Sequence, residues 1–235
     1  RKANLMRFCA LALVLWPAVA GAQTITSAEF GAPTTRYDHG ILGDAVEWGA
    51  LQFVADGMTY QITLPESHVF EDIAPRLWDV TGDGQPEIVV IETDMAHGAA
   101  FAIYGTAGKI AQTPYIGRTH RWLAPIGAAD LDGDGAIEIA YIDRPHLAKT
   151  LRIWRFADGA LTHVRDVPGL TNHRIGEDNI AGGIRDCGHG PEMITANENW
   201  SRVIATSFTD GKIQSHDIGP HVDRTSFAAA MACEH

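Results

Sequence analysis

The strongest constraint on the fold of this chain is a segment that recurs about once every fifty residues. Residues 79–92 read DVTGDGQPEIVVIE and residues 130–143 read DLDGDGAIEIAYID, an offset of 51 residues. A third segment, 184–197, aligns with them through Glu192, which stands 54 residues after Glu138. Self-similarity at such a period is typical of repeat architectures. The sequence therefore predicts several copies of one structural unit.

The part of each repeat that follows its glutamate predicts β-structure. The glutamate opens an apolar run of strand length, and a second β-like segment follows. That segment ends in a glycine or an Asp-Gly pair, which favours a hairpin turn into a last short strand. Upstream, a histidine marks the phase of each repeat, with spacings of 52, 53 and 48 residues between His68, His120, His173 and His221.

Two incomplete repeats determine the predicted topology. Residues 45–64 match the outer two strands of a repeat but lack a complete inner strand, and residues 221–231 begin a repeat and stop. A ring joins these fragments, whereas a linear array leaves exposed strand edges at both ends. The prediction is an all-β fold, a small four-bladed β-propeller closed by the C-terminal strand.

The predicted propeller domain spans residues 23–235. A five-bladed ring, with residues 23–44 as a further divergent unit, is the main alternative. A β-sandwich built from the same strands gives the repeat no structural cause. The four predicted blades are roughly 35–64 with 221–235, 68–116, 120–170, and 173–219.

The acidic turn of the repeat has the spacing of a calcium loop. In the second copy, aspartates occupy alternate positions of a tight turn, and a glutamate follows at the ninth position. Such side chains converge on one point, and hard oxygen donors with several negative charges suit Ca²⁺ better than Mg²⁺. The predicted ligands are Asp130, Asp132, Asp134, the carbonyl of Ala136 and Glu138, and in the first copy Asp79, Thr81, Asp83, the carbonyl of Gln85 and Glu87.

The three copies of this turn differ in their donors. Thr81 replaces a carboxylate in the first copy, so weaker binding is expected there. The third copy keeps only Asp186 and Glu192, and no calcium is expected there. Neither of the first two is an EF-hand, because Val90 or Tyr141 stands at the twelfth position and β-like runs follow. A metal-free Asp-Gly hairpin is the alternative interpretation.

The segments DVTGDGQPEIVV and DLDGDGAIEIAYI resemble the calcium loops of the FG-GAP/VCBS repeat family. The family includes the integrin alpha-chain propeller and many exported bacterial proteins. The resemblance covers roughly residues 68–217 and implies a propeller with structural calcium in loops between inner strands. It implies no single activity, because members serve in adhesion, in ligand binding and as appendages of enzymes. Integrin propellers have seven blades, so this shorter chain departs from that pattern.

Residues 1–22 have the pattern of a secretory signal peptide. Basic residues precede the apolar run FCALALVLW, and Ala20 and Ala22 stand at the −3 and −1 positions of a cut before Gln23. The apolar run is too short for a membrane anchor. We expect an exported protein, periplasmic or extracellular, with no membrane span after cleavage. Cleavage removes three basic and no acidic residues, so the net charge falls from −11 to −14, which argues against a nucleic-acid partner.

Two cysteines, Cys187 and Cys233, remain after this cut. They follow His173 by 14 residues and His221 by 12, so both fall in the turn at the inner strand, in the last and the first predicted blades. Those blades are neighbours only in a closed ring. A Cys187–Cys233 disulfide is therefore predicted to lock the closing strand.

The sequence carries no local catalytic motif. It has no G-x-S-x-G elbow, no H-E-x-x-H and no phosphate-binding glycine loop. The repeated histidines, together with His39, either converge on the axis of the ring around a transition metal or simply orient their strands. Asp94 with His97, and Asp143 with His146, recur in loops opposite the acidic turns and define a candidate binding surface.

The function expected from these features is that of a calcium-stabilised binding or protein-interaction module. Its partner is expected to be a protein or a saccharide, neither of which the sequence identifies. The alternative is a periplasmic hydrolase or lyase that uses histidines and carboxylates on one face of the propeller. Whether the chain is an enzyme is left open by its residues.

Overall fold

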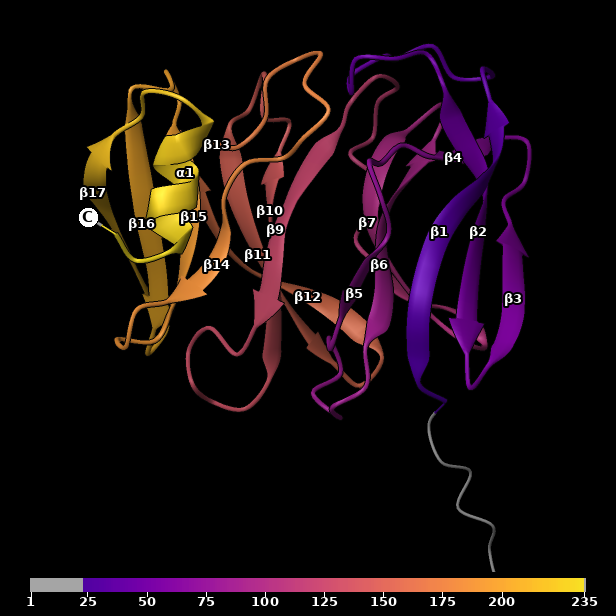
Figure 1. Ribbon diagram of the computed structural model, residues 1–235, viewed down its shortest axis with the longest axis horizontal. Coiled ribbons are helices and arrows are strands. Elements are labelled where there is room, and N and C mark those ends of the chain that lie inside the picture. Colours follow the sequence, from indigo (N-terminus) through magenta and orange to yellow (C-terminus); the bar gives the residue numbers. More distant parts are fainter. Residues whose placement is uncertain (1–22, 235) are drawn as a thin grey trace, which may run out of the picture.

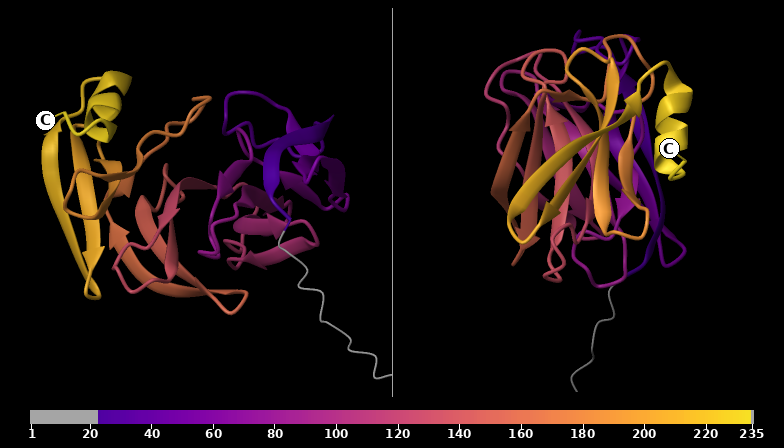
Figure 2. Two further views of the ribbon diagram at one scale, coloured as in Figure 1. Left: turned by 60° about the horizontal axis from the view of Figure 1, so that its bottom comes forward. Right: turned by 90° about the vertical axis from the view of Figure 1, so that its left-hand side faces the viewer.

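The structure, a computed structural model, describes residues 23–234, and the predicted signal peptide lies outside them. The described residues form seventeen strands and one helix. The strands make three antiparallel sheets that follow one another along an open arc (Figures 1 and 2). No helix in this part of the chain is long and apolar enough to cross a membrane.

The first sheet contains eight strands, and a single residue pair, Trp48 with Phe70, joins its N-terminal three to the rest. Those three strands also pack face to face on the centre of the sheet, where Leu51 and Phe53 contact a buried cluster that includes Ile88 and Val90. The strands are β1 (Ile25–Thr34), β2 (Glu47–Ala55), β3 (Met58–Thr63), β4 (His68–Phe70), β5 (Arg76–Trp78), β6 (Glu87–Asp94), β7 (Gly98–Gly105) and β8 (Gly108–Gln112).

The second and third sheets each hold one further repeat. The second is β9 (Leu123–Ala129), β10 (Ile137–Asp143), β11 (Thr150–Ala157) and β12 (Ala160–Pro168). The third is β13 (Leu170–Thr171), β14 (Gly183–Asp186), β15 (Pro191–Asn197), β16 (Arg202–Thr209) and β17 (Lys212–Pro220), followed by the helix α1 (Arg224–Met231).

Each repeat of the sequence folds as four antiparallel strands, β5–β8, β9–β12 and β14–β17. The inner strand is continuous in the second repeat, where β9 pairs along β10. In the first and third repeats it is interrupted, and β4 and β13 pair with the far ends of β6 and β15. The hairpins between the outer strands of the N-terminal unit and of the last two repeats turn at Asp-Gly. Both residues there have positive φ, as at Asp56 (49°) and Gly57 (76°), which is the geometry of a type I′ turn.

Apolar side chains fill each space between neighbouring sheets. Val89 and Phe101 of the first sheet pack against Ile139 and Tyr141 of the second, and a further buried cluster joins the second sheet to the third. The strands β6 and β7 are buried along almost their whole length, because other layers cover both of their faces. The outermost strands, β3, β8, β12 and β17, are mostly exposed or half-buried.

The predicted closure of the ring by a C-terminal strand is wrong. Residues 224–231 form α1, whose buried Phe227 and Ala230 pack on Ile194 and Ala205 of the third sheet. Local signals favour the helix, because Asp223 is its N-cap, Ser226 completes a capping box, and three consecutive alanines are strong helix formers.

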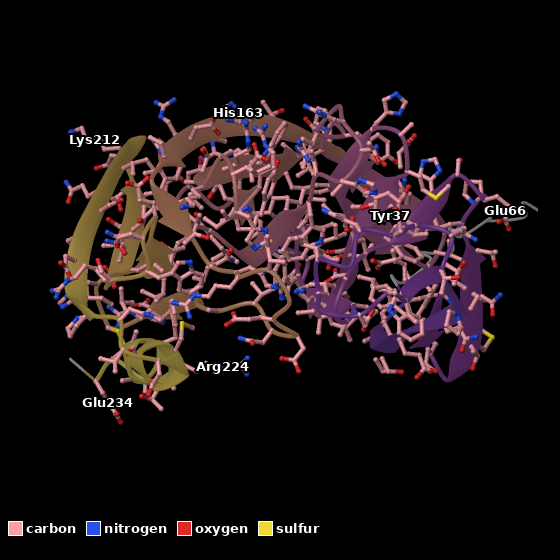
Figure 3. All side chains as sticks on the ribbon, turned by 90° about the horizontal axis from the view of Figure 1, so that it is seen from above. Tyr37, Glu66, His163, Lys212, Arg224 and Glu234 are labelled. Atoms are coloured by element: carbon pink, nitrogen blue, oxygen red, sulfur yellow. A yellow bond between two sulfur atoms is a disulfide. The ribbon has the colours of Figure 1, made fainter. Side chains whose placement is uncertain are left out.

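The strand that completes the N-terminal unit comes from the residues just before it in the chain and not from the C-terminus. Residues 25–34, which the sequence places only in the alternative fifth blade, form β1 and pair with β2 over nearly its full length. The two ends of the arc lie apart, with Glu66 at one end and Arg224 and Glu234 at the other (Figure 3). The loop between β1 and β2 contacts the loop between β13 and β14, since the Gly176 amide donates to the Ile41 carbonyl at 3.0 Å. The number of blades stays a prediction.

The structure contains a disulfide between Cys187 and Cys233, with Cα atoms 5.8 Å apart. It ties the residues after α1 to the turn between β14 and β15. Both cysteines therefore belong to the same end of the arc, and the expectation that Cys233 lies in the first blade is wrong. The bond fixes the helix to the sheet that it covers.

We expect the packing of α1 to stabilise the whole third sheet. Phe227→Ala should lower the free energy of unfolding by about 3 kcal/mol, because it removes a buried aromatic ring and leaves a cavity. Val222→Ala is the control, since Val222 is 78% exposed and its truncation should change stability by less than about 0.5 kcal/mol. Urea unfolding of both variants measures the difference, and equal effects would contradict a covering role for the helix.

Candidate functional site

The second acidic turn lies between β9 and β10, at the lower end of the molecule in Figure 1. Its carboxylates hold the turn in shape by accepting hydrogen bonds from the backbone. Asp130 accepts from the amides of Gly133 (2.8 Å) and Gly135 (3.0 Å), and Glu138 accepts from the amide of Leu131 (2.9 Å). Both glycines have positive φ, which the tight reversal requires.

Three of the predicted ligands of this turn come together. Ligand oxygens of Asp130, Asp132 and Glu138 lie within 4.8 Å of one another. The Oδ1 atom of Asp132 is buried and has no hydrogen-bond partner in the structure. An orphaned buried oxygen among carboxylates fits a hard cation such as Ca²⁺. The fourth carboxylate, Asp134, accepts from the amide of Ala136 at 2.9 Å and lies outside this group of three.

A guanidinium group already lies among these carboxylates. Arg155 of β11 contacts Glu138 at 2.5 Å, Asp132 at 2.6 Å and Asp134 at 2.8 Å. The register of the sheet places it there, because Glu138 and Arg155 are directly opposed on β10 and β11. The repeat pattern does not reveal Arg155, since the spacing within a turn carries no information about the strand beside it. Burial raises the pKa of Glu138, and the hydrogen bond from Arg155 opposes that shift.

The first acidic turn has the same backbone hydrogen bonds and no such arginine. Asp79 accepts from the amides of Gly82 (2.7 Å) and Gly84 (2.9 Å). Glu87 accepts from the amides of Val80 and Thr81 at 2.8 and 3.1 Å, and from the Thr81 hydroxyl at 3.2 Å. Of the other predicted donors, Asp83 accepts from the amide of Gln85 at 2.8 Å.

The register explains why no guanidinium reaches the first turn. Ile88 of β6 pairs with Tyr104 of β7, so the next residue, Gly105, takes the place that Arg155 has in the second repeat. In the third repeat the arginine that pairs with the glutamate comes from another strand, since Arg185 of β14 donates to Glu192 at 3.0 Å. Among the three repeated glutamates of the described chain, only Glu87 has no arginine partner in range.

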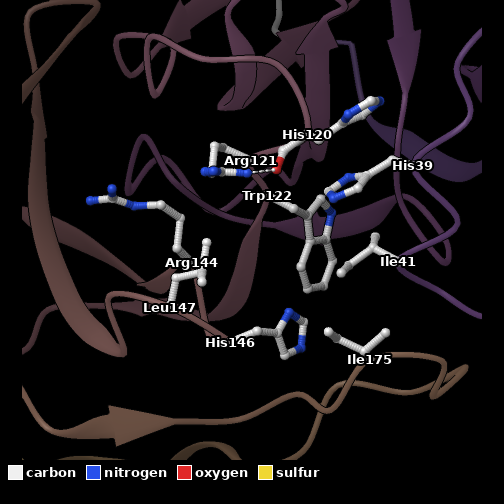
Figure 4. Close-up of a pocket in the computed structure, with 9 residues that line it drawn as sticks. All are labelled: His39, Ile41, His120, Arg121, Trp122, Arg144, His146, Leu147 and Ile175. Atoms are coloured by element: carbon white, nitrogen blue, oxygen red, sulfur yellow. Dashed lines mark hydrogen bonds between the residues drawn. The ribbon is translucent and has the colours of Figure 1, made fainter.

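The opposite end of the molecule carries a cavity of about 240 Å³ among the loops (Figure 4). These loops lie opposite the acidic turns because successive strands run antiparallel, so β10 ends where β9 begins. No described carboxylate lines the cavity. Its lining is His39, Ile41, His120, Arg121, Trp122, Arg144, His146, Leu147 and Ile175.

The four repeated histidines do not converge on one point. His120 lines the cavity, and His173 lies behind it, where its Nδ1 is 3.1 Å from Nε2 of His146. His68 lies near Asp94 on the first sheet, and His221 packs against the ring of Phe227. The only group of three or more metal-binding side chains found among residues 23–234 is the acidic one at 130–138. His39 and His146 join the cavity instead, a grouping that the repeat spacing did not reveal.

Buried carboxylates hold the loops behind this cavity. Glu71 is fully buried and forms an ion pair with His39, while its other oxygen accepts from the Thr93 hydroxyl at 2.7 Å. Burial raises the pKa of Glu71, and His39 opposes that shift. Burial, with repulsion from His173, lowers the pKa of His146 to about 4, so this imidazole is neutral at pH 7. Burial also raises the pKa of Tyr37, which packs on the His39 ring, to about 12.

Comparison with known proteins supports the assignment of the repeats. Residues 79–141 match the model of a family described as FG-GAP-like repeat. The matched stretch begins at the first residue of the first acidic turn and ends within β10, so it contains both turns. The resemblance to this repeat family is thereby confirmed for these residues. No curated protein matches the chain.

We expect Arg155 to substitute for a metal ion in holding the second turn together. In the presence of a chelator, Arg155→Met should lower the free energy of unfolding by about 2 kcal/mol, because the buried carboxylate of Glu138 loses its charged partner. The control is Arg165→Met, since Arg165 is exposed and donates only to backbone carbonyls. If denaturant unfolding shows equal losses for the two variants, the ion pairs of Arg155 contribute no stability.

The buried carboxylate of Glu47 predicts a pH dependence of stability. Burial, with the nearby charges of Glu71, Asp44 and Asp72, raises its pKa to about 9 from an ordinary value of 4.5. The folded protein therefore binds one more proton than the unfolded chain between these values, and stability should fall as the pH rises from about 5 to 9. Glu47→Gln should flatten this decline in urea unfolding, whereas Glu66→Gln, whose side chain is 94% exposed, should leave the slope as it is.

Proposed function

We propose that this chain is an exported, calcium-stabilised β-propeller-type module that binds a partner and catalyses no reaction of its own. The observation that carries the proposal is the FG-GAP-like match over residues 79–141, which spans both acidic turns. In this proposal the turns at the lower end in Figure 1 rigidify the repeats, and the loops at the other end contact a protein or a saccharide.

Calcium is proposed at both turns. At the second turn it competes with an arginine for the carboxylates, and at the first turn it does not. The convergence of Asp130, Asp132 and Glu138 and the orphaned oxygen of Asp132 support a site at the second turn. A calcium ion there must displace Arg155, whose charge opposes a second cation. The first turn, with Asp79 and the other donors around it, offers fewer carboxylates but faces no such competitor. When bound, the ion neutralises converging carboxylates and fixes the turn.

Two further observations support an exported binding module. The Cys187–Cys233 disulfide suits an oxidising compartment, which agrees with the signal-peptide pattern of residues 1–22. The cavity at the loop end offers imidazole and guanidinium groups but no lining carboxylate and no serine or cysteine nucleophile among the described residues. A hydrolase that forms a covalent intermediate needs such a nucleophile beside its histidines, and the carboxylates that two of the cavity histidines contact, Glu71 and Asp38, lie outside the lining.

The proposal predicts that calcium raises the melting temperature. At a calcium concentration a hundredfold above the dissociation constant, the shift should be roughly 5–10 °C relative to chelator, because the ion binds only the folded turns. Asp79→Asn and Asp132→Asn should each reduce the shift, and Arg155→Met should enlarge it by freeing the second turn. The control is Asp158→Asn, at a hairpin outside both acidic turns. An identical melting curve in calcium and in chelator, with no heat of binding on calcium titration, rules the calcium sites out.

A further inference from the structure

The loop-end cavity has an electrostatic character opposite to that of the chain as a whole. The full sequence carries a formal charge of −11, and yet the cavity is lined by two arginines and three histidines and by no carboxylate. The remaining lining residues are apolar. Such a combination, a cationic group beside an apolar wall, is what a ligand with an anionic end and a hydrocarbon body requires.

Arg121 supplies the positive charge that the protein leaves uncompensated. Its Nη1 donates to the carbonyl of His120 at 2.6 Å, and its Nε and Nη2 make no hydrogen bond within the described chain. No described carboxylate lies in ion-pair range of it. The Nε–Nη2 edge is one that binds a carboxylate through two parallel hydrogen bonds. This edge is therefore available for a ligand.

The second arginine of the cavity is already paired. Arg144 donates through Nε and Nη2 to the two oxygens of Asp143, each at 2.9 Å, so only its Nη1 is left over. His120 is near Asp38, with 3.0 Å between Nε2 and Oδ1. The unbalanced charge of the cavity is thus close to that of one guanidinium, which matches a monoanion better than a phosphate.

The apolar residues of the cavity fall into two sets, a buried one on its floor and an exposed one at its mouth. Trp122 is 2% exposed and Ile41 is 6% exposed, and they form the inner surface. Leu147 and Ile175 lie at the mouth and are 63% and 69% exposed, with no described chain segment covering them. Figure 4 shows Arg121, Arg144 and Leu147 on one side of Trp122 and His39 and Ile41 on the other.

We propose that this cavity binds a small organic monocarboxylate with an aromatic or branched hydrocarbon body. The carboxylate pairs with the free edge of Arg121, the body lies against Trp122 and Ile41, and Leu147 and Ile175 cover it from the mouth. A volume of about 240 Å³ is below that of a cavity for drug-sized ligands, so the ligand is small. The inference rests on the proposed binding function and gives it a ligand class.

The probe for this site is 3-phenylpropionate, titrated calorimetrically and by the change in tryptophan fluorescence of the protein. The matched probe 3-phenylpropanamide has the same shape and no charge. We expect the acid to bind at least tenfold more tightly than the amide, because a charge-assisted pair with Arg121 is lost in the amide. Failure of the acid to bind, or equal binding of acid and amide, overturns the proposal.

Two variants locate the binding on the protein. Arg121→Gln should weaken binding of the acid at least tenfold, whereas Arg118→Gln, an exposed arginine of the same loop that does not line the cavity, should not. Leu147→Ser should weaken it severalfold, and because Leu147 is exposed its loss should not affect folding. Val222→Ser is the exposed control for that change. Unchanged affinity in both Arg121→Gln and Leu147→Ser contradicts this location.

The calcium response separates this inference from the proposed function. Arg121→Gln and Leu147→Ser lie at the end of the molecule away from the acidic turns, so both should keep the calcium-dependent rise in melting temperature. A protein that responds to calcium and ignores 3-phenylpropionate overturns the ligand assignment alone. A protein that binds the acid but shows no response to calcium overturns the calcium sites and leaves the cavity assignment intact.

Discussion

Each repeat of this protein has, at the first or second position of its second strand, a glutamate whose carboxylate must be compensated where the sheets pack. Burial of an ionised carboxylate is costly unless donors surround it. Glu87 relies on two amides and the hydroxyl of Thr81, and Glu138 uses the amide of Leu131 and the guanidinium of Arg155. The acidic turns are folded back onto these glutamates. The shape of these turns therefore depends on the core of the sheets, with or without a bound cation.

Acidic and basic side chains gather at opposite ends of the molecule, and at both ends buried or paired carboxylates are compensated. Aspartates gather in the turns that precede β6 and β10, where backbone amides and an arginine donate hydrogen bonds to their carboxylates. Arginines and histidines gather in the loops at the other ends of these strands, where buried Glu71 and Asp143 orient His39 and Arg144. An acidic chain thus presents a cavity free of lining carboxylates. The two ends of the molecule therefore differ in the charge that they present.

The ends of the arc are covered by elements that are not copies of the repeat. At the C-terminal end α1 covers the apolar face of the third sheet and is fastened by the disulfide. At the N-terminal end β1 completes the unit that contains β2 and β3. Terminal elements of this kind are what stacked repeats need, because each repeat otherwise leaves one apolar face without a neighbour.

The sequence by itself determined the four-stranded repeats, the Asp-Gly hairpins and the two acidic turns, because each of these depends on residues close together in the chain. Tertiary structure decided the rest. Repeat spacing assigned the residues after His221 to a strand, but Asp223, three alanines and a buried Phe227 make them a helix. Arg155 reaches Asp132 only through strand register, and the cavity joins His39, His120, His146 and Ile175 from four separate loops. Contacts between distant segments leave no spacing in the sequence, so only the packing of the sheets brings them together.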